Sequence, residues 1–166
     1  METLDPSTLI SDSRKITDIF GYWPTFHDAE VIDLQLSIAD GEPWIPGSQS
    51  PVLEMLVYVF EMTKDLTPDG YFVLTKHNLV RLQFANVQDL QLSDFWFQNC
   101  IFELTFSQER AGSPQGGDAD PSGAPSLLSI EINASVGLSG QFKCRFARVL
   151  SVEPCDDSGK PIGTSL

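Results

Sequence analysis

The densest group of side chains that could do chemistry lies at residues 20–31, in the run FGYWPTFHDAEV. Four aromatic residues, one histidine and two carboxylates occur in this run. His27, Asp28 and Glu30 offer one nitrogen and two oxygen donors, a sensible ligand set for a divalent metal ion. The same residues could perform general acid–base catalysis, with the imidazole of His27 oriented by a carboxylate.

Little else in the chain supports either of these two chemistries. His27 and Asp28 are adjacent and would point to opposite faces of an extended backbone, and His77 is the only other histidine. There is no Gly-x-Ser-x-Gly, no phosphate-binding glycine loop, no dinucleotide fingerprint and no Cys-x-x-Cys. We therefore predict no catalytic residues, no metal ligands and no cofactor.

A third interpretation of the run is structural, and it has the most support from residue type. Trp23 and Phe26 would anchor a turn in the core, while His27 and Asp28 would hydrogen-bond the turn or the ends of strands. Aromatic side chains are mostly buried, and histidine is frequently a satisfied hydrogen-bonding residue. This interpretation is compatible with binding, because the same turn could present its polar side chains to a partner.

Two further features stand outside this run. Arg148 falls on the apolar face of the last predicted strand, where a bulge or a snorkelled stem explains it better than a buried ion pair with Asp28 or Glu30. Residues 95–97 are three consecutive aromatics, so one ring is exposed if the segment is extended. Core and edge packing is the simpler interpretation of these rings, and an interface anchor is the alternative.

The elements that position these residues follow from the hydrophobic pattern. A short helix is predicted over residues 12–20, with Asp12 as a possible N-cap and Gly21 at its end. The hydrophobic period then changes to two, which predicts strands at 32–38, 53–62, 71–84, 100–106, 128–132 and 141–153. One short helix followed by six or seven strands, without a βαβ rhythm, indicates an α+β fold in which the helix packs on a mostly antiparallel sheet.

Length and composition predict a single domain over residues 1–166. The chain is 42% hydrophobic, which is enough for a core, and we place that core at residues 12–154. Residues 111–125 are rich in glycine and proline and are predicted to be a flexible hairpin insertion, because strands continue on both sides. Residues 155–166 are predicted to be a frayed tail.

The charge of the chain excludes whole classes of partner. With 23 acidic and 10 basic residues, the net charge is −13, and an acidic surface repels phosphate backbones and anionic lipids. We therefore predict no nucleic-acid partner and no membrane partner. The first residues resemble no signal peptide, and no apolar run is long enough to cross a bilayer, so we expect a cytoplasmic protein.

The run at residues 20–31 resembles the signature of the immunity protein 50 family, small bacterial proteins of polymorphic toxin systems that carry a WPSFHDAEV-like motif. Residues 82–99, which include Gln98-Asn99, and residues 131–154 are also similar to the family. Thr25 stands where the family has serine. The family favours polar residues where this chain has its second and third consecutive aromatics, Trp96 and Phe97.

The resemblance implies a cytosolic protein that binds and neutralises a toxin domain and has no enzymatic activity of its own. The positions that match the family motif, and would contribute to binding, are Trp23, Phe26, His27, Asp28 and Glu30. Many toxin domains of this type are nucleases, which are cationic because they grip phosphate, so an acidic inhibitor would be steered toward them. The alternative function is a small metal-dependent enzyme that uses His27, Asp28 and Glu30.

Overall fold

The computed structural model describes residues 4–40, 47–109 and 126–162, so the predicted insertion at 111–125 lies outside the described residues. The described part contains two short helices and an eight-stranded sheet. The helices are α1 (Pro6–Leu9) and α2 (Arg14–Phe20). The strands are β1 (Glu30–Asp40), β2 (Gln49–Leu66), β3 (Phe72–Ala85), β4 (Gln88–Ser93), β5 (Cys100–Gln108), β6 (Leu128–Val136), β7 (Ser139–Cys144) and β8 (Phe146–Pro154).

The sheet is antiparallel throughout, with strand order β4-β7-β6-β5-β1-β2-β3-β8. The mostly antiparallel α+β class is therefore correct, but the prediction of one helix and six to seven strands is not. The short strand β4 was missed, and the predicted strand at 141–153 is broken at Arg145 into β7 and β8. Strands β7 and β8 lie in opposite halves of the sheet, so the chain passes from one half to the other at Arg145.

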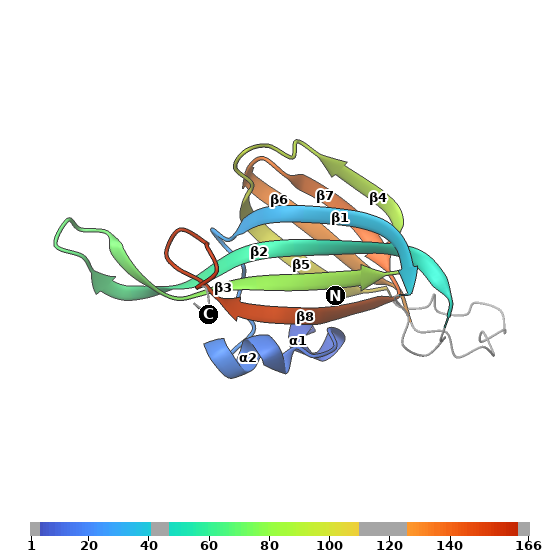
Figure 1. The fold of residues 1–166 in the computed structure, drawn as a ribbon, viewed down its shortest axis with the longest axis horizontal. Coiled ribbons are helices and arrows are strands. Elements are labelled where there is room, and N and C mark those ends of the chain that lie inside the picture. The colour runs from blue at the N-terminus through green and yellow to red at the C-terminus, as the bar shows by residue number, and fades with distance from the viewer. Residues whose placement is uncertain (1–3, 41–46, 110–125, 163–166) are drawn as a thin grey trace.

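The eight strands form two layers that are joined at one residue pair. Glu30 of β1 pairs with Cys100 of β5, and this is the only pair in the register between those strands. Beyond it the strands diverge, so that β1, β2, β3 and β8 form one layer and β5, β6, β7 and β4 form the other (Figure 1). We refer to the junction around Glu30 and Cys100 as the seam.

The main hydrophobic core fills the space between the two layers. Alternate residues of β2 and β3 face it, and the opposite layer supplies alternate residues of β5, β6 and β7. Phe84 and Phe142 join the layers directly, with ring centroids 5.0 Å apart in an edge-to-face arrangement. Each fully buried side chain of this kind stabilises the fold by about 1.5 to 3 kcal/mol.

The divergence of the layers leaves part of β1 uncovered. The sequence predicted a half-buried strand from the alternation of Ile32, Leu34, Leu36 and Ile38. Leu36 is 59% exposed and Ile38 is 64% exposed, although Leu53, the neighbour of Leu36 on β2, is buried in the core. Leu34, Leu36 and Ile38 do share one face, but a bulge between Val31 and Asp33 takes Ile32 out of the predicted alternation. The second layer turns away where it would have covered Leu36 and Ile38.

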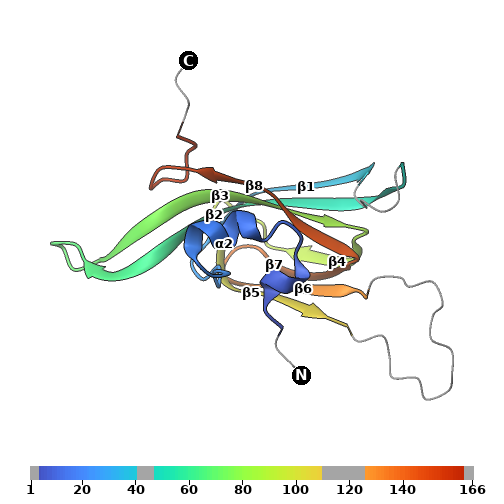
Figure 2. The same cartoon turned by 90° about the horizontal axis from the view of Figure 1, so that it is seen from below.

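The N-terminal segment packs across the open edge of β8. The backbone N–H of Ser11 donates to the carbonyl of Ala147, and the N–H of Val149 donates to the carbonyl of Ser11. Lys15 Nζ donates to the carbonyl of Leu150 over 3.1 Å. The segment therefore continues the sheet for one bridge and then turns into α2, below β8 in Figure 1 and beside it in Figure 2.

Helix α2 is anchored by its buried face and ends at a glycine. Ile16 and Phe20 are buried in the main core, whereas Ile19, the third apolar residue of the helical pattern, is 38% exposed. Gly21 takes a left-handed φ of 83°, and its N–H donates to the carbonyl of Thr17. The N-cap position is occupied by Ser13 and not by Asp12, and Ser13 makes no side-chain capping bond. Neither helix in the described residues is long and apolar enough to cross a membrane.

The chain after β8 folds back onto the outer face of β2 and β3. Cys155 is 4% exposed and forms a second hydrophobic cluster with Tyr58 and Leu79. The carboxylate of Asp156 accepts hydrogen bonds from the backbone N–H groups of Ser158 and Lys160, which closes the turn. Residues 155–162 of the predicted frayed tail therefore form a hydrogen-bonded turn in which Cys155 is buried and most other residues are exposed. Residues 163–166 lie outside the described residues.

Candidate functional site

Residues 21–29, which we call the motif turn, connect α2 to β1 and are held on β5 by backbone hydrogen bonds. The N–H of Asp28 donates to the carbonyl of Ile101 over 2.9 Å, and the N–H of Ile101 donates to the carbonyl of Ala29 over 2.8 Å. Phe26 and Asp28 have positive φ values of 60° and 64°. Residues with side chains adopt this conformation only where the surrounding structure holds them in it, and the bonds to β5 provide that restraint.

The aromatic half of the motif points into the core. Phe26 is 2% exposed, and its ring centroid lies 5.7 Å from that of Trp23. The half-buried indole of Trp23 also meets the ring of Phe106 edge to face at 5.8 Å. The structural interpretation of Trp23 and Phe26 is therefore confirmed, since both rings hold the turn against β5.

The polar half of the motif faces solvent. The side chain of His27 is 51% exposed and that of Asp28 is 38% exposed, with His27 Nδ1 3.1 Å from Asp28 Oδ2. We expected these neighbours to point to opposite faces of an extended chain. The positive φ of Asp28 turns the backbone between them, so the two side chains meet. The imidazole also packs edge to face on Phe102, with ring centroids 5.4 Å apart.

Glu30 lies apart from this pair, on the outer face of the seam. It is half-buried and is paired across the sheet with Tyr58 on one side and Cys100 on the other. Burial, together with the carboxylates of Asp28 and Glu30, raises the pKa of the Cys100 thiol. A protonated thiol is a poor nucleophile and a poor metal ligand, so the seam is not arranged for cysteine chemistry.

The described residues contain no metal-binding arrangement. No group of three or more His, Cys, Asp and Glu side chains within them could hold a metal ion. His77 is on β3, where its Nδ1 lies 2.6 Å from the hydroxyl of Tyr58 beneath the C-terminal turn, and it does not join His27. The donor set of His27, Asp28 and Glu30 is therefore not completed by the second histidine.

Arg148 lies on the outer face of the sheet, away from the motif. Its Nε donates to Gln83 Oε1 over 2.7 Å, and the amide of Gln83 in turn donates to Glu54. The predicted bulge is present, because the register between β3 and β8 shifts between Arg81 and Leu82. The core residues of β8 are consequently Ala147 and Val149, and Arg148 points outward between them.

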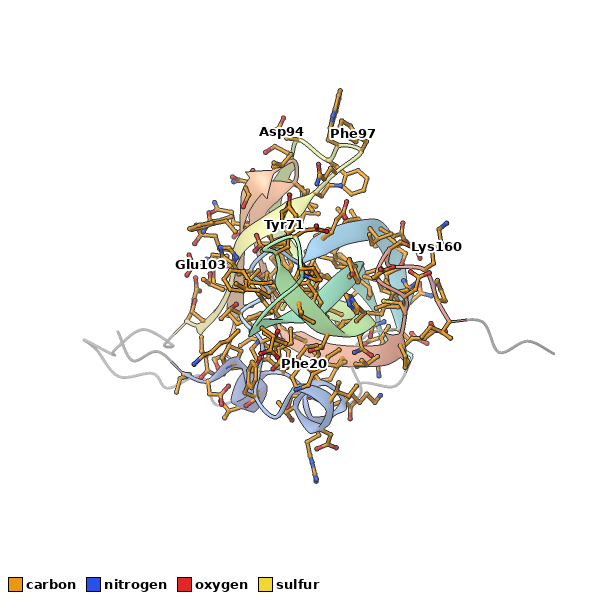
Figure 3. All side chains as sticks on the ribbon, turned by 90° about the vertical axis from the view of Figure 1, so that its left-hand side faces the viewer. Phe20, Tyr71, Asp94, Phe97, Glu103 and Lys160 are labelled. Carbon is orange, nitrogen blue, oxygen red and sulfur yellow. The ribbon has the colours of Figure 1, made fainter. Side chains whose placement is uncertain are left out.

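The loop between β4 and β5 exposes three consecutive aromatic rings. Phe95 is 51% exposed, Trp96 is 64% exposed and Phe97 is 84% exposed. We refer to residues 94–99 as the aromatic loop; Figure 3 shows Asp94 and Phe97 at its outer end. The sequence favoured packing for these rings and left an interface anchor as the alternative. The structure places all three outside the core.

The aromatic loop is held in place by Asn99, which is 3% exposed. Asn99 Oδ1 accepts hydrogen bonds from the N–H groups of Trp96 and Leu138, over 2.9 and 3.1 Å. Asn99 Nδ2 donates to the carbonyls of Trp96 and Val31, over 2.8 and 3.4 Å. Our residue-by-residue interpretation missed this role, and the only signal was the Gln98-Asn99 pair within the family resemblance.

Comparison with known proteins identifies the family. A search of the curated proteins and a search of the solved structures each found no significant match. The model of the immunity protein 50 family matches residues 12–155, which cover the motif turn, both layers of the sheet and the aromatic loop. This family is not a family of enzymes, in agreement with our prediction that the chain has no catalytic activity. The chain belongs to the immunity protein 50 family.

Proposed function

We propose that this protein binds a cognate toxin domain in the cytosol and neutralises it, and that the toxin domain is a cationic one such as a nuclease. The observation that carries the proposal is the match to the immunity protein 50 family over residues 12–155. The neutralising complex is stoichiometric, because the chain acts by occupying the toxin and not by modifying it.

The charge of the protein supports a basic partner. The net charge is −13, and an acidic protein attracts a cationic domain from a distance and selects against acidic competitors. Among the described residues, the ion pairs of lysine and arginine involve Asp18, Glu54, Glu61, Asp89 and Glu109. None of these pairs includes Asp28 or Glu30, so no lysine or arginine of the described residues neutralises them; Asp28 is paired with the imidazole of His27.

The five motif residues divide into two roles in this proposal. His27, Asp28 and Glu30 contact the toxin domain, because their side chains reach the surface at the seam. Trp23 and Phe26 act indirectly, since their packing on Phe106 and on each other sets the shape of the turn. Replacing either ring therefore reduces both stability and binding, whereas replacing His27 reduces binding alone.

The test is co-expression with the toxin domain encoded beside the gene. Cells that make both proteins are expected to survive, and the two chains are expected to co-elute on gel filtration in a fixed ratio. Protection should end once the toxin exceeds one equivalent of this protein. If the toxin still kills and no complex elutes, the proposed function is wrong, and protection by far less than one equivalent would indicate catalytic inactivation instead.

A further inference from the structure

We propose that the aromatic loop is the principal docking element for a basic protein partner, with Trp96 and Phe97 entering the partner's surface and the surrounding carboxylates pairing with its lysines and arginines. The inference rests on the proposed function, because the partner is the toxin domain. It differs from that function in placing most of the binding free energy outside the family motif, at Trp96 and Phe97.

The exposure of the loop is the first argument. Trp96 and Phe97 contact each other with ring centroids 5.8 Å apart, yet they are 64% and 84% exposed. A soluble chain seldom presents adjacent large rings to water without a binding role, and tryptophan is the residue type most enriched among interface hot spots. Burial of these rings in a partner's pocket would recover apolar area that folding leaves in contact with water.

The rigidity of the loop is the second argument. Asn99 makes two hydrogen bonds to the backbone of Trp96 within the loop, one to β1 and one to the turn before β7. Gly137 lies so close to the loop that an added Cβ would stand 2.3 Å from the carbonyl oxygen of Gln98. A loop already held in one conformation loses little entropy on binding, which is the property expected of a binding anchor.

The charge around the loop selects the kind of partner. From Leu82 to Glu109 the chain contains no lysine or arginine, while Asp94 and Glu103 lie in this stretch. Glu30 stands at the base of the loop, because it pairs with Cys100, the residue after Asn99. In the described residues no ion pair involves any of these three carboxylates.

A basic protein surface therefore complements both features of this region, the rings and the charge. An anionic membrane would be repelled by the carboxylates, and a second copy of the chain would bring like charges together. The exposed rings at the far end of the β2–β3 hairpin, Tyr71 and Phe72, differ in this respect. That end also carries Lys64 and Lys76, so its carboxylates are partly balanced.

The two exposed ring pairs allow a matched experiment. The loop variant is Trp96→Ala with Phe97→Ala, and the control is Tyr71→Ala with Phe72→Ala at residues that are 74% and 53% exposed. Each is titrated calorimetrically with the purified toxin domain encoded beside the gene. We expect Kd to rise at least about 100-fold for the loop variant and less than about threefold for the control. Circular dichroism should show both variants folded, because all four rings lie at the surface.

Each outcome supports or overturns the docking role of the aromatic loop. If wild-type protein binds the toxin and the loop variant binds equally well, docking lies elsewhere and the proposed function stands. If wild-type protein does not bind, both proposals fail. A loss in the control as large as that in the loop variant also overturns the loop as principal element. The wild-type chain is also sedimented alone and with phosphatidylglycerol vesicles. If it self-associates or binds the vesicles, and the loop variant does not, the rings bind a second copy of the chain or a membrane, and the proposal is overturned.

Discussion

At the scale of single residues, one buried amide joins three segments that are distant in the sequence. Asn99 bonds to the backbone of β1, of its own loop and of the turn before β7. No periodic pattern marks such a residue, because its partners are backbone groups brought together only by the tertiary fold. Trp23 and Phe26 were predicted correctly as anchors because ring size alone favours burial. The binding role of His27, Asp28 and Glu30 stays a prediction.

Gly137 lies in the turn beside Asn99. Among the described glycines with a positive φ, it is the one at which an added Cβ would come closest to a neighbouring atom. In Gly137→Ala the new methyl would meet the carbonyl oxygen of Gln98, on a backbone already at a φ of 78°. We expect a loss of about 3 kcal/mol or more in the free energy of unfolding, from conformational strain and steric overlap together. Urea denaturation measures this loss directly.

Gly70→Ala is the matched control for that substitution. Gly70 has a φ of 86°, but nothing lies within 4 Å of an added Cβ. Only the conformational strain remains, so we expect a loss of about 1 kcal/mol. Equal losses at the two positions would mean that the close approach between Gly137 and Gln98 does not restrict the aromatic loop.

A buried phenol makes stability depend on alkaline pH. Burial, with Cys155 and Asp157 adding to it, raises the pKa of Tyr58 from its ordinary value of 10.0 to about 12. The folded state therefore holds this proton more tightly than the unfolded state does. The resulting stability is complete below about pH 10 and is lost as pH rises toward 12.

The Tyr58→Phe variant isolates this dependence. It is less stable near neutral pH because the hydrogen bond from the Tyr58 hydroxyl to the Asp157 carbonyl is lost. The difference in unfolding free energy between wild type and variant should then shrink between about pH 10 and pH 12. A difference that stays constant over this range would show that the hydroxyl titrates alike in both states. Urea unfolding at a series of pH values provides the measurement.

At the scale of elements, the hydrophobic period predicted most strands. It did not predict where each strand ends or which part of the chain packs against it. Strand β4 was missed because only Leu90 and Leu92 mark its inner face. The alternation of Phe142, Cys144 and Phe146 runs unbroken through Arg145, so nothing local signals that the chain changes layers there. On the outer face of β2, Tyr58 is covered by the C-terminal turn, which the hydrophobic period does not indicate.

Two truncations test how much the C-terminal turn contributes to stability. Truncation after Pro154 deletes Cys155 and exposes Tyr58 and Leu79 on the outer face of β2 and β3. We expect a loss of about 2 to 4 kcal/mol, which corresponds to a fall of about 5 to 15 °C in Tm. Truncation after Ile162 keeps the turn and should change Tm by less than about 2 °C. Thermal unfolding of the two shortened chains compares them, and equal melting would show that the turn contributes no stability.

At the scale of the whole molecule, the imbalance of charge is concentrated in the N-terminal part of the chain. Residues 1–70 contain 13 acidic and 3 basic residues, a net of −10 out of the total of −13. The motif turn and β1 both belong to this part. Asp28 and Glu30 are among these carboxylates, and the field of this excess negative charge acts on a partner before any contact forms.

Association with the toxin domain should accordingly depend on salt. Between about 50 and 500 mM NaCl we expect the association rate constant to fall at least about tenfold, because the Debye length shortens below the separation of the approaching charges. The dissociation rate constant should change far less. Stopped-flow fluorescence separates the two rates. If the association rate constant is the same at all salt concentrations, electrostatic steering is not part of the proposed function.

The contact between the N-terminal segment and β8 orders events during protein synthesis. Ser11 and Lys15 are made well before the residues whose carbonyls they meet, Ala147 and Leu150. Until β8 leaves the ribosome, β3 has no outer neighbour and Ile16 has no completed core to enter. Closure of the core therefore waits until β8 has been made, and before that the unfinished sheet presents apolar side chains that the folded protein buries.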